Sequence, residues 1–141
     1  MDIYHNILRK YWGYSNFRPL QEEIIHSICS GKDTLGLMPT GGGKSITFQV
    51  SALTMEGICL VVSPLIALMQ DQERRMQEGN LSAVTFRGGQ SPEERAEKIK
   101  AIKEAPYRFL LPHPYRSFPQ TPCSCPQPSQ TPYNSAFRIR A

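Results

Sequence analysis

The chain has 141 residues, which corresponds to about one domain and is enough to bury a hydrophobic core. Its formal net charge of +4 does not indicate a nucleic-acid surface, because residues 1–104 hold equal numbers of basic and acidic side chains and the surplus lies in four later arginines. Four cysteines without a signal peptide, and the lack of an apolar run long enough to span a bilayer, predict a reducing, cytoplasmic setting.

The first half of the chain alternates between helical and extended patterns. Apolar residues at helical spacing predict helices over residues 3–12 and 20–28, separated by a break at residues 13–19. A short apolar run at residues 33–38 then predicts a buried strand, and residues 46–55 again have helical spacing. The order is therefore two helices, a strand and a helix.

The second half continues this alternation. Residues 58–62 form a continuous apolar run, typical of a strand covered on both faces, and residues 65–78 predict a helix. A strand is predicted over residues 81–86, followed by a helix from Ser91 to Lys103 that opens with a capping box, and another strand over residues 107–111. Strands separated by helices predict an α/β fold with a parallel sheet covered by helices on both faces.

The sequence Met-Pro-Thr-Gly-Gly-Gly-Lys-Ser at residues 38–45 lies between a predicted strand and a predicted helix. Glycines without Cβ let the backbone turn its N–H groups toward phosphate oxygens, and Lys44 adds a positive charge. The hydroxyl of Ser45 is placed to bind Mg²⁺ as the chain enters the helix. The pattern indicates a nucleoside triphosphate site, although Met38 replaces the first glycine of the strict motif. The alternative is a flexible glycine turn that caps a helix.

Two further motifs flank this loop. Residues 13–21 read Gly-Tyr-Ser-Asn-Phe-Arg-Pro-Leu-Gln, and residues 63–72 read Ser-Pro-Leu-Ile-Ala-Leu-Met-Gln-Asp-Gln. In this order the three motifs resemble the start of the first motor domain of RecQ-family DNA helicases, a P-loop (RecA-like) fold of the second helicase superfamily. That family tolerates a residue other than glycine where Met38 stands. The resemblance covers roughly residues 1–110.

The resemblance implies roles for individual residues in ATP binding. The amide of Gln21 offers a donor and an acceptor to the edge of adenine, and Tyr14 offers an aromatic face for stacking. Without the family, this segment reads as an ordinary loop before a helix, with a buried Phe17. The implied ATP-binding residues are Tyr14, Arg18, Gln21, Thr40, Gly41, Gly42, Gly43, Lys44 and Ser45, with Lys44 as catalytic residue and Ser45 as Mg²⁺ ligand.

The resemblance also implies contacts with single-stranded DNA. Ser63, Pro64 and Leu65 match a motif in which a hydroxyl and helix-start N–H groups hold phosphates. Arg87 and Gly88 lie where the family makes another contact at a strand end. The alternative for the first group is an ordinary strand-to-helix turn.

The implied activity is ATP-dependent DNA unwinding in the 3'-5' direction, in recombination and repair, with ATP and Mg²⁺ as cofactors. Such a motor also needs an Asp-Glu pair for Mg²⁺ and water activation, and a second lobe with an arginine finger. The sequence contains no Asp-Glu-x-His. We therefore expect the chain alone to bind ATP and DNA weakly and to be inactive. Alternatives are a module that binds nucleotide or single-stranded DNA and regulates a partner, and a small P-loop kinase, which is disfavoured because residues 58–62 lead into serine instead of aspartate.

The composition changes after Leu111. Residues 112–141 contain seven prolines, no acid and no lysine, and this segment is predicted to be disordered, leaving residues 1–111 as the motor-lobe region. Cys123 and Cys125 have no matching pair, so a zinc site is not expected.

One hypothesis for this segment is out-of-frame translation. One permitted set of codons for residues 111–116 encodes Tyr-Leu-Thr-Pro-Ile-Glu when read one nucleotide later, close to the family's expected continuation. A shifted frame is also not selected for a foldable pattern of charge and apolar residues. The alternative is a natural proline-rich tail, such as a polyproline ligand. The DNA downstream of the Leu111 codon distinguishes the two.

Overall fold

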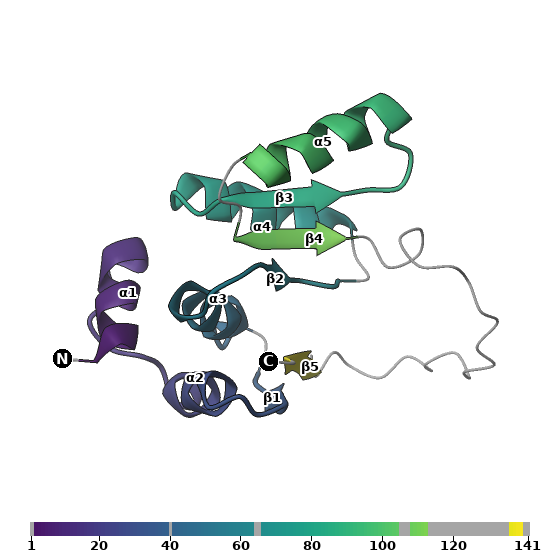
Figure 1. Cartoon of the computed structure of the whole chain (residues 1–141). Coiled ribbons are helices and arrows are strands. Elements are labelled where there is room, and N and C mark those ends of the chain that lie inside the picture. Colours follow the sequence, from purple (N-terminus) through teal and green to yellow (C-terminus); the bar gives the residue numbers. More distant parts are fainter. Residues whose placement is uncertain (1, 40, 64–65, 105–107, 113–135, 140–141) are drawn as a thin grey trace, which may run out of the picture. The chain divides into compact units, whose positions relative to one another are not determined.

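The computed structural model describes residues 2–39, 41–63, 66–104, 108–112 and 136–139. The chain divides into two compact units: unit 1 comprises residues 1–56 and 126–141, and unit 2 comprises residues 57–125. Figure 1 shows the helices and strands of both units in the colours of the sequence.

Unit 1 holds the helices around the glycine loop. Its elements are α1 (Ile3–Trp12), α2 (Gln21–Cys29), β1 (Thr34–Leu37), α3 (Lys44–Thr54) and β5 (Ala136–Ile139). Helix α1 ends at Gly13, whose φ of 73° lets its N–H reach the carbonyl of Arg9 at 3.0 Å. The three helices predicted from apolar spacing are confirmed, and α3 begins at Lys44 instead of residue 46.

The core of unit 1 lies where α1 and α2 pack on α3. Leu8, Ile25 and Val50, one from each helix, are completely buried. Ile28 of α2 and Met38, which follows β1, extend this apolar core. The glycine loop is therefore attached at both ends to packed elements, which fixes its position.

Strand β1 pairs antiparallel with β5, with Leu35 opposite Arg138 and Leu37 opposite Ala136. It is not part of the parallel sheet, although the sequence pattern placed residues 33–38 there. The pairing was not predictable, because β5 lies about a hundred residues from β1 in a segment predicted to be disordered. Of residues 112–141 the structure describes Pro112 and residues 136–139, and both are in strands; the remaining residues of that prediction lie outside the described part of the chain.

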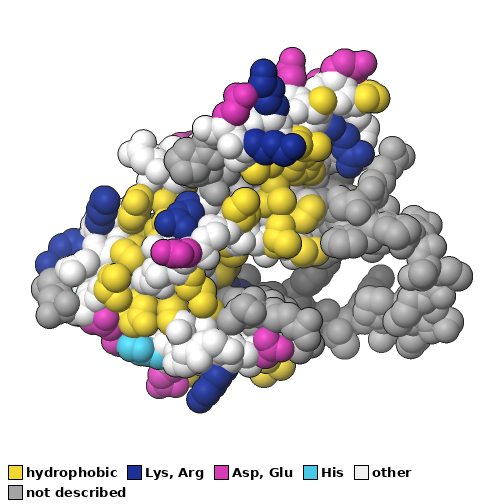
Figure 2. Space-filling view, viewed as in Figure 1, with side chains coloured by type: hydrophobic (Ala, Val, Ile, Leu, Met, Phe, Trp, Pro, Cys, Tyr) yellow, Lys and Arg dark blue, Asp and Glu magenta, His cyan; other side chains and the backbone are white. Residues whose placement is uncertain are grey.

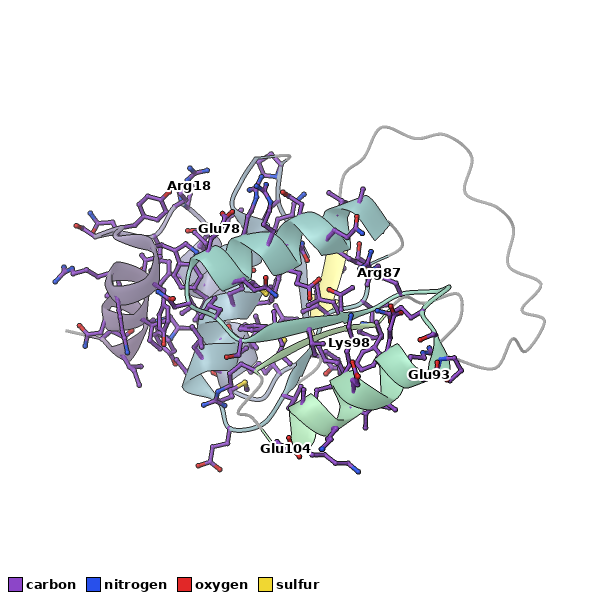
Figure 3. The ribbon with its side chains drawn as sticks, turned by 90° about the horizontal axis from the view of Figure 1, so that it is seen from above. Arg18, Glu78, Arg87, Glu93, Lys98 and Glu104 are labelled. Carbon is purple, nitrogen blue, oxygen red and sulfur yellow. The ribbon has the colours of Figure 1, made fainter. Side chains whose placement is uncertain are left out.

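Unit 2 contains a three-stranded parallel sheet in the order β2-β4-β3. Its elements are β2 (Cys59–Leu60), α4 (Ile66–Glu78), β3 (Ala83–Phe86), α5 (Pro92–Glu104) and β4 (Phe109–Pro112). The chain crosses from β2 to β3 through α4 and returns to β4 through α5. Right-handed crossovers in opposite directions place the two helices on opposite faces of the sheet, as Figure 3 shows. The predicted α/β fold with a helix-covered parallel sheet is confirmed in this unit.

The two faces of this sheet are covered unequally. Helix α4 buries Met69 and Met76 completely or almost so, and Phe109 and Leu111 of β4 are fully buried. No described residue of α5 is buried.

Helices α4 and α5 have 13 residues each. No helix in the described part of the chain is both long and apolar enough to cross a membrane.

Strand β2 differs from its prediction. The apolar run at residues 58–62 was expected to be covered on both faces, but Ile58, Leu60 and Val62 are 52%, 63% and 58% exposed. These alternate residues share one face of the chain, and at β2, the edge strand of the described sheet, the described elements leave that face uncovered. Figure 2 shows apolar side chains at the surface in the region of β2 and β4.

The opposite edge of the sheet is held by side chains of both helices. The N–H of Thr85 in β3 donates to Glu73 Oε1 of α4 at 3.3 Å, and its carbonyl accepts from Lys98 Nζ of α5 at 2.6 Å. These contacts satisfy backbone groups that an edge strand otherwise exposes. The predicted capping box is confirmed as well, because the backbone N–H groups of Ser91 and Glu94 each donate to the other's side chain at 3.1 Å.

Candidate functional site

The glycine loop connects β1 to α3 and contains two left-handed glycines. Gly41 and Gly43 have φ of 79° and 80°, a conformation that costs glycine little and other residues much more. Between them, the N–H of Gly42 donates to the carbonyl of Pro39 at 3.0 Å. A Cβ on Gly42 would lie 2.9 Å from that same oxygen, so the turn leaves no room for a side chain there. The sequence-based prediction of a tight glycine loop is confirmed in its conformation.

Helix α3 starts directly after this loop. Gly43 is its N-cap residue and no side chain caps the helix. The first turn of a helix has N–H groups without intrahelical partners and carries a partial positive charge, so an uncapped N-terminus favours an anion. The hydroxyl of buried Thr47 donates to the carbonyl of Lys44 at 2.5 Å, and the hydroxyl of Ser51 donates to Thr47 at 2.7 Å. These bonds stabilise the helix start that carries Lys44 and Ser45.

Arg18 and Gln21, both predicted to bind ATP, are brought to the glycine loop. Arg18 Nη1 donates to the carbonyl of Gly41 at 2.8 Å, and Gln21 Nε2 donates to the carbonyl of Gly43 at 2.9 Å. Figure 3 shows Arg18 projecting from the segment between α1 and α2. Sequence reasoning placed these residues in the same site but missed their contact with the loop carbonyls, because no spacing rule links side chains more than twenty residues from their acceptors.

The other predicted ATP-binding residues are placed as follows. Tyr14 is 53% exposed, so its ring face is accessible to a ligand. Ser45 is half-buried in the first turn of α3. Thr40 lies outside the described residues. The roles of these residues in ATP binding stay predictions.

The loop fits a phosphate group on two grounds: its left-handed glycines and the uncapped helix that follows it. For Mg²⁺, the loop region supplies the hydroxyl of Ser45. A different group of potential metal ligands lies on α2 and at the start of α1, where the ligand atoms of Asp2, Glu22 and His26 lie within 4.8 Å of one another. All three side chains are at least one-third exposed, with His26 Nε2 3.8 Å from Asp2 and 3.9 Å from Glu22.

The predicted DNA-contact residues are in unit 2, where the strand ends organise them. Ser63 follows β2 and Arg87 follows β3, while Pro64 and Leu65 lie outside the described residues. Because β2 and β3 both run parallel to β4, these residues follow the same end of the sheet. One strand separates β2 from β3, so the two strand ends are about 10 Å apart.

A cavity of about 560 Å³ adjoins Arg87 and Gly88 and extends along α5. The backbone N–H of Arg87 donates to Gln90 Oε1 at 3.0 Å. Its Nε is buried, and no partner for it exists in the described part of the chain. The side chain of Arg87 is partly exposed beside the cavity, and a guanidinium group can donate hydrogen bonds to an anionic ligand. The cavity is lined by Arg87, Gly88, Gly89, Gln90, Glu94, Glu97, Lys98 and Ala101.

Comparison with known proteins identifies relatives of this chain. A model of the DEAD/DEAH box helicase family matches residues 18–116. The chain is 39% identical over 112 residues to the ATP-dependent DNA helicase RecQ of Bacillus subtilis, which covers 79% of this chain and 19% of that protein. It is 43% identical over 103 residues to RecQ of Synechocystis, covering 73% and 22%, and 39% identical over 111 residues to helicase Q-like 4B of Arabidopsis thaliana, covering 79% and 9%.

The resemblance to RecQ helicases that the three motifs predicted is confirmed by these relatives. The chain spans about a tenth to a fifth of their length.

Proposed function

Because the chain belongs to the DEAD/DEAH box helicase family, we propose that residues 41–45 of unit 1 bind the phosphates of ATP together with Mg²⁺. The observation that carries this proposal is the loop backbone, with left-handed Gly41 and Gly43 directly before an uncapped helix. Such a backbone presents several N–H donors to one anion. A flexible glycine turn, the alternative, needs neither Lys44 nor Ser45 at its exit.

The side chains of the loop add charge and metal binding. Lys44 contributes a point charge for the outer phosphates, and the hydroxyl of Ser45 is a ligand for the Mg²⁺ that accompanies ATP. Bound Mg²⁺ would neutralise phosphate charge during transfer chemistry. Tyr14 stacks on the adenine ring, and Arg18, Gln21 and Thr40 complete the site. We expect weak binding, since a site open to water weakens each electrostatic contact.

Unit 2 supplies the DNA contacts in this proposal. Ser63 and Arg87 follow parallel strands at the same end of the sheet, which suits a nucleic-acid backbone that passes across strand ends. Pro64, Leu65 and Gly88 lie beside them in the sequence. The guanidinium of Arg87, whose side chain lines the cavity, supports a phosphate contact. The contact is with the backbone, so it carries little base specificity.

The first test is calorimetric titration of the full chain with Mg·ATP. Lys44→Ala should abolish the binding, because the charge opposite the outer phosphates is lost. Lys32→Ala is the matched control, since Lys32 is an exposed lysine of the same unit that precedes β1. Unchanged affinity in Lys44→Ala would remove the loop from the proposed site.

A second test concerns catalysis. We expect no DNA-stimulated ATP hydrolysis by the pure chain, because no Asp-Glu pair is present to hold Mg²⁺ and activate the attacking water. The measurement is phosphate release with and without single-stranded DNA. A stimulated rate that disappears in Lys44→Ala would contradict this expectation, and would also exclude the alternative of an inactive module that regulates a partner.

A further inference from the structure

Arg18, just before α2, and Gln21, the first residue of α2, donate hydrogen bonds to three successive carbonyl groups of the glycine loop. Arg18 donates to the carbonyl of Gly41 at 2.8 Å. Gln21 Nε2 donates to the carbonyl of Gly43 at 2.9 Å and to that of Gly42 at 3.4 Å. In a trans peptide the C=O and the N–H of the next residue point in opposite directions. Holding the carbonyls of Gly42 and Gly43 therefore directs the N–H groups of residues 43 and 44 to the opposite side, whereas the N–H of Gly42 donates to the carbonyl of Pro39.

The amide of Gln21 is fully engaged in this arrangement. The side chain is 1% exposed, and its Oε1 accepts the backbone N–H of Arg18 at 2.8 Å. Its Nε2 lies within hydrogen-bonding distance of the carbonyls of Gly43 and Gly42. Only one orientation of the amide satisfies these partners. In this arrangement Nε2 is bonded to the loop and Oε1 to the backbone of Arg18.

Gly43 is packed directly against this amide. A Cβ built on Gly43 would collide with Gln21 Nε2, whereas a Cβ on Gly41 would meet nothing within 4 Å. Both glycines are left-handed, so conformation alone does not distinguish them. The contact with Gln21 is thus a second reason for glycine at position 43. The loop and Gln21 are packed as one assembly.

We propose that Gln21 is a positioning residue for the phosphate-binding loop, in addition to any contact it makes with adenine. It orients the N–H groups of residues 43 and 44 through the carbonyls of the same peptide groups, so its effect extends to a phosphate ligand that has no base. This inference rests on the proposed ATP binding by the same loop. Arg18 orients one peptide group in the same way, because it donates a hydrogen bond to the carbonyl of Gly41.

The variant that tests this is Gln21→Met, which keeps the length of the side chain and removes its amide. Gln49→Met is the matched control. Gln49 is also buried in unit 1, at 6% exposure in α3, and makes none of the hydrogen bonds to the carbonyls of residues 41–43. A second variant, Arg18→Met, removes an exposed contact and leaves the core intact.

The first measurement is hydrogen exchange of the ligand-free full chain. In Gln21→Met, exchange at the amides of residues 43 and 44 should rise about tenfold, because a restraint comparable to one hydrogen bond is lost. Gln49→Met should leave these amides unchanged, and Arg18→Met should raise exchange at Gly42. If Gln21→Met raises exchange throughout unit 1, the Arg18→Met variant is the deciding measurement. A rise in exchange confined to Gly42 in that variant supports the inference that side-chain bonds to the loop carbonyls restrain the loop amides. Unchanged exchange at residues 43 and 44 in Gln21→Met, together with unchanged exchange at Gly42 in Arg18→Met, overturns it.

The second measurement compares Mg·ATP with Mg·tripolyphosphate, which has phosphates but no base. We expect Gln21→Met to weaken both ligands by similar factors, about tenfold or more. A loss confined to ATP, with tripolyphosphate affinity unchanged, would assign Gln21 to adenine alone and overturn the inference. Lys44→Ala keeps the two proposals apart: if it leaves tripolyphosphate affinity unchanged, the proposed ATP site has failed, and hydrogen exchange still decides the role of Gln21.

Discussion

Unit 1 and unit 2 bury different kinds of side chain. In the described part of unit 1 the buried residues include Gln21, Thr47, Gln49 and Ser51, whereas in unit 2 the buried polar residue is Thr85. Burial of a polar group is costly unless it is hydrogen-bonded. In unit 1, Gln21 donates a hydrogen bond to a backbone carbonyl of the glycine loop, and Thr47 donates one to the carbonyl of Lys44. The buried polar side chains of Gln21 and Thr47 therefore hold the glycine loop and the start of α3, in addition to the apolar core of unit 1.

The edges of the unit 2 sheet show a second contrast. At β3 the backbone of Thr85 is bonded to Glu73 and Lys98. At β2 the bonds of Cys59 and Val61 lead to β4, so the N–H and C=O of Leu60 point to the open edge. Side chains of the described helices close one edge and leave the other open. An open edge with exposed apolar residues is a surface that tends to pair with a further strand.

The largest effect on stability is expected from Phe109→Ala. Phe109 is completely buried in β4. Its removal should lower the free energy of unfolding of unit 2 by about 3–5 kcal/mol, measured by urea denaturation. Ile99→Ala is the control, because Ile99 is 48% exposed on α5. If the units differ in function as proposed, the affinity for Mg·ATP is retained whenever unit 1 remains folded. Loss of ATP binding with unit 1 still folded would contradict the assignment.

A smaller effect is expected from raising the pH. Burial raises the pKa of the Cys59 thiol to about 11 from its usual value near 9.0. Below pH 9 the thiol is protonated in both states. Between pH 9 and 11 it ionises only in the unfolded state, so the free energy of unfolding falls, by about 2 kcal/mol across this range. Urea denaturation of the wild type and of Cys59→Ala from pH 8 to 11 measures the difference. The same pH dependence in both proteins would show that Cys59 does not contribute.

The smallest effects are expected from a pair of buried threonines, one in each unit. Thr47→Val should lower the free energy of unfolding of unit 1 by about 1 kcal/mol, because a bond to the carbonyl of Lys44 is lost. Thr85 Oγ1 has no hydrogen-bond partner among the described residues, so Thr85→Val should leave unit 2 unchanged or stabilise it by about 1 kcal/mol. The comparison uses equilibrium denaturation monitored separately for each unit by hydrogen exchange. An equal decrease in the free energy of unfolding in both variants would contradict the proposed difference between the two units.

The sequence predicts the local features well. The helix ends at Gly13 and Gly79, the glycine loop and the capping box at Ser91 all depend on residues close together in the chain, and the structure contains each of them. Membership of the helicase family was also predictable, from three motifs in a fixed order. These features depend on backbone conformation and short spacing, which a single sequence displays directly.

Non-local features were not predictable. The bonds from Gln21 to the loop carbonyls join residues more than twenty positions apart, and the pairing of β1 with β5 joins residues about a hundred positions apart. The exposure of Leu60 depends on strand order, which an apolar run does not specify. The roles in ATP and DNA binding remain predictions, since the described contacts place the residues without testing what they bind.

The central claim is that the nucleotide site is in unit 1, and hydrogen exchange of the full chain with and without Mg·ATP tests it most directly. The account predicts slower exchange with Mg·ATP at residues 18–21 and 41–47, and unchanged exchange in β3 and β4 of unit 2. Lys44→Ala should remove the difference. Protection in β3 and β4 without any at residues 41–47 would contradict the claim and place the ligand in unit 2.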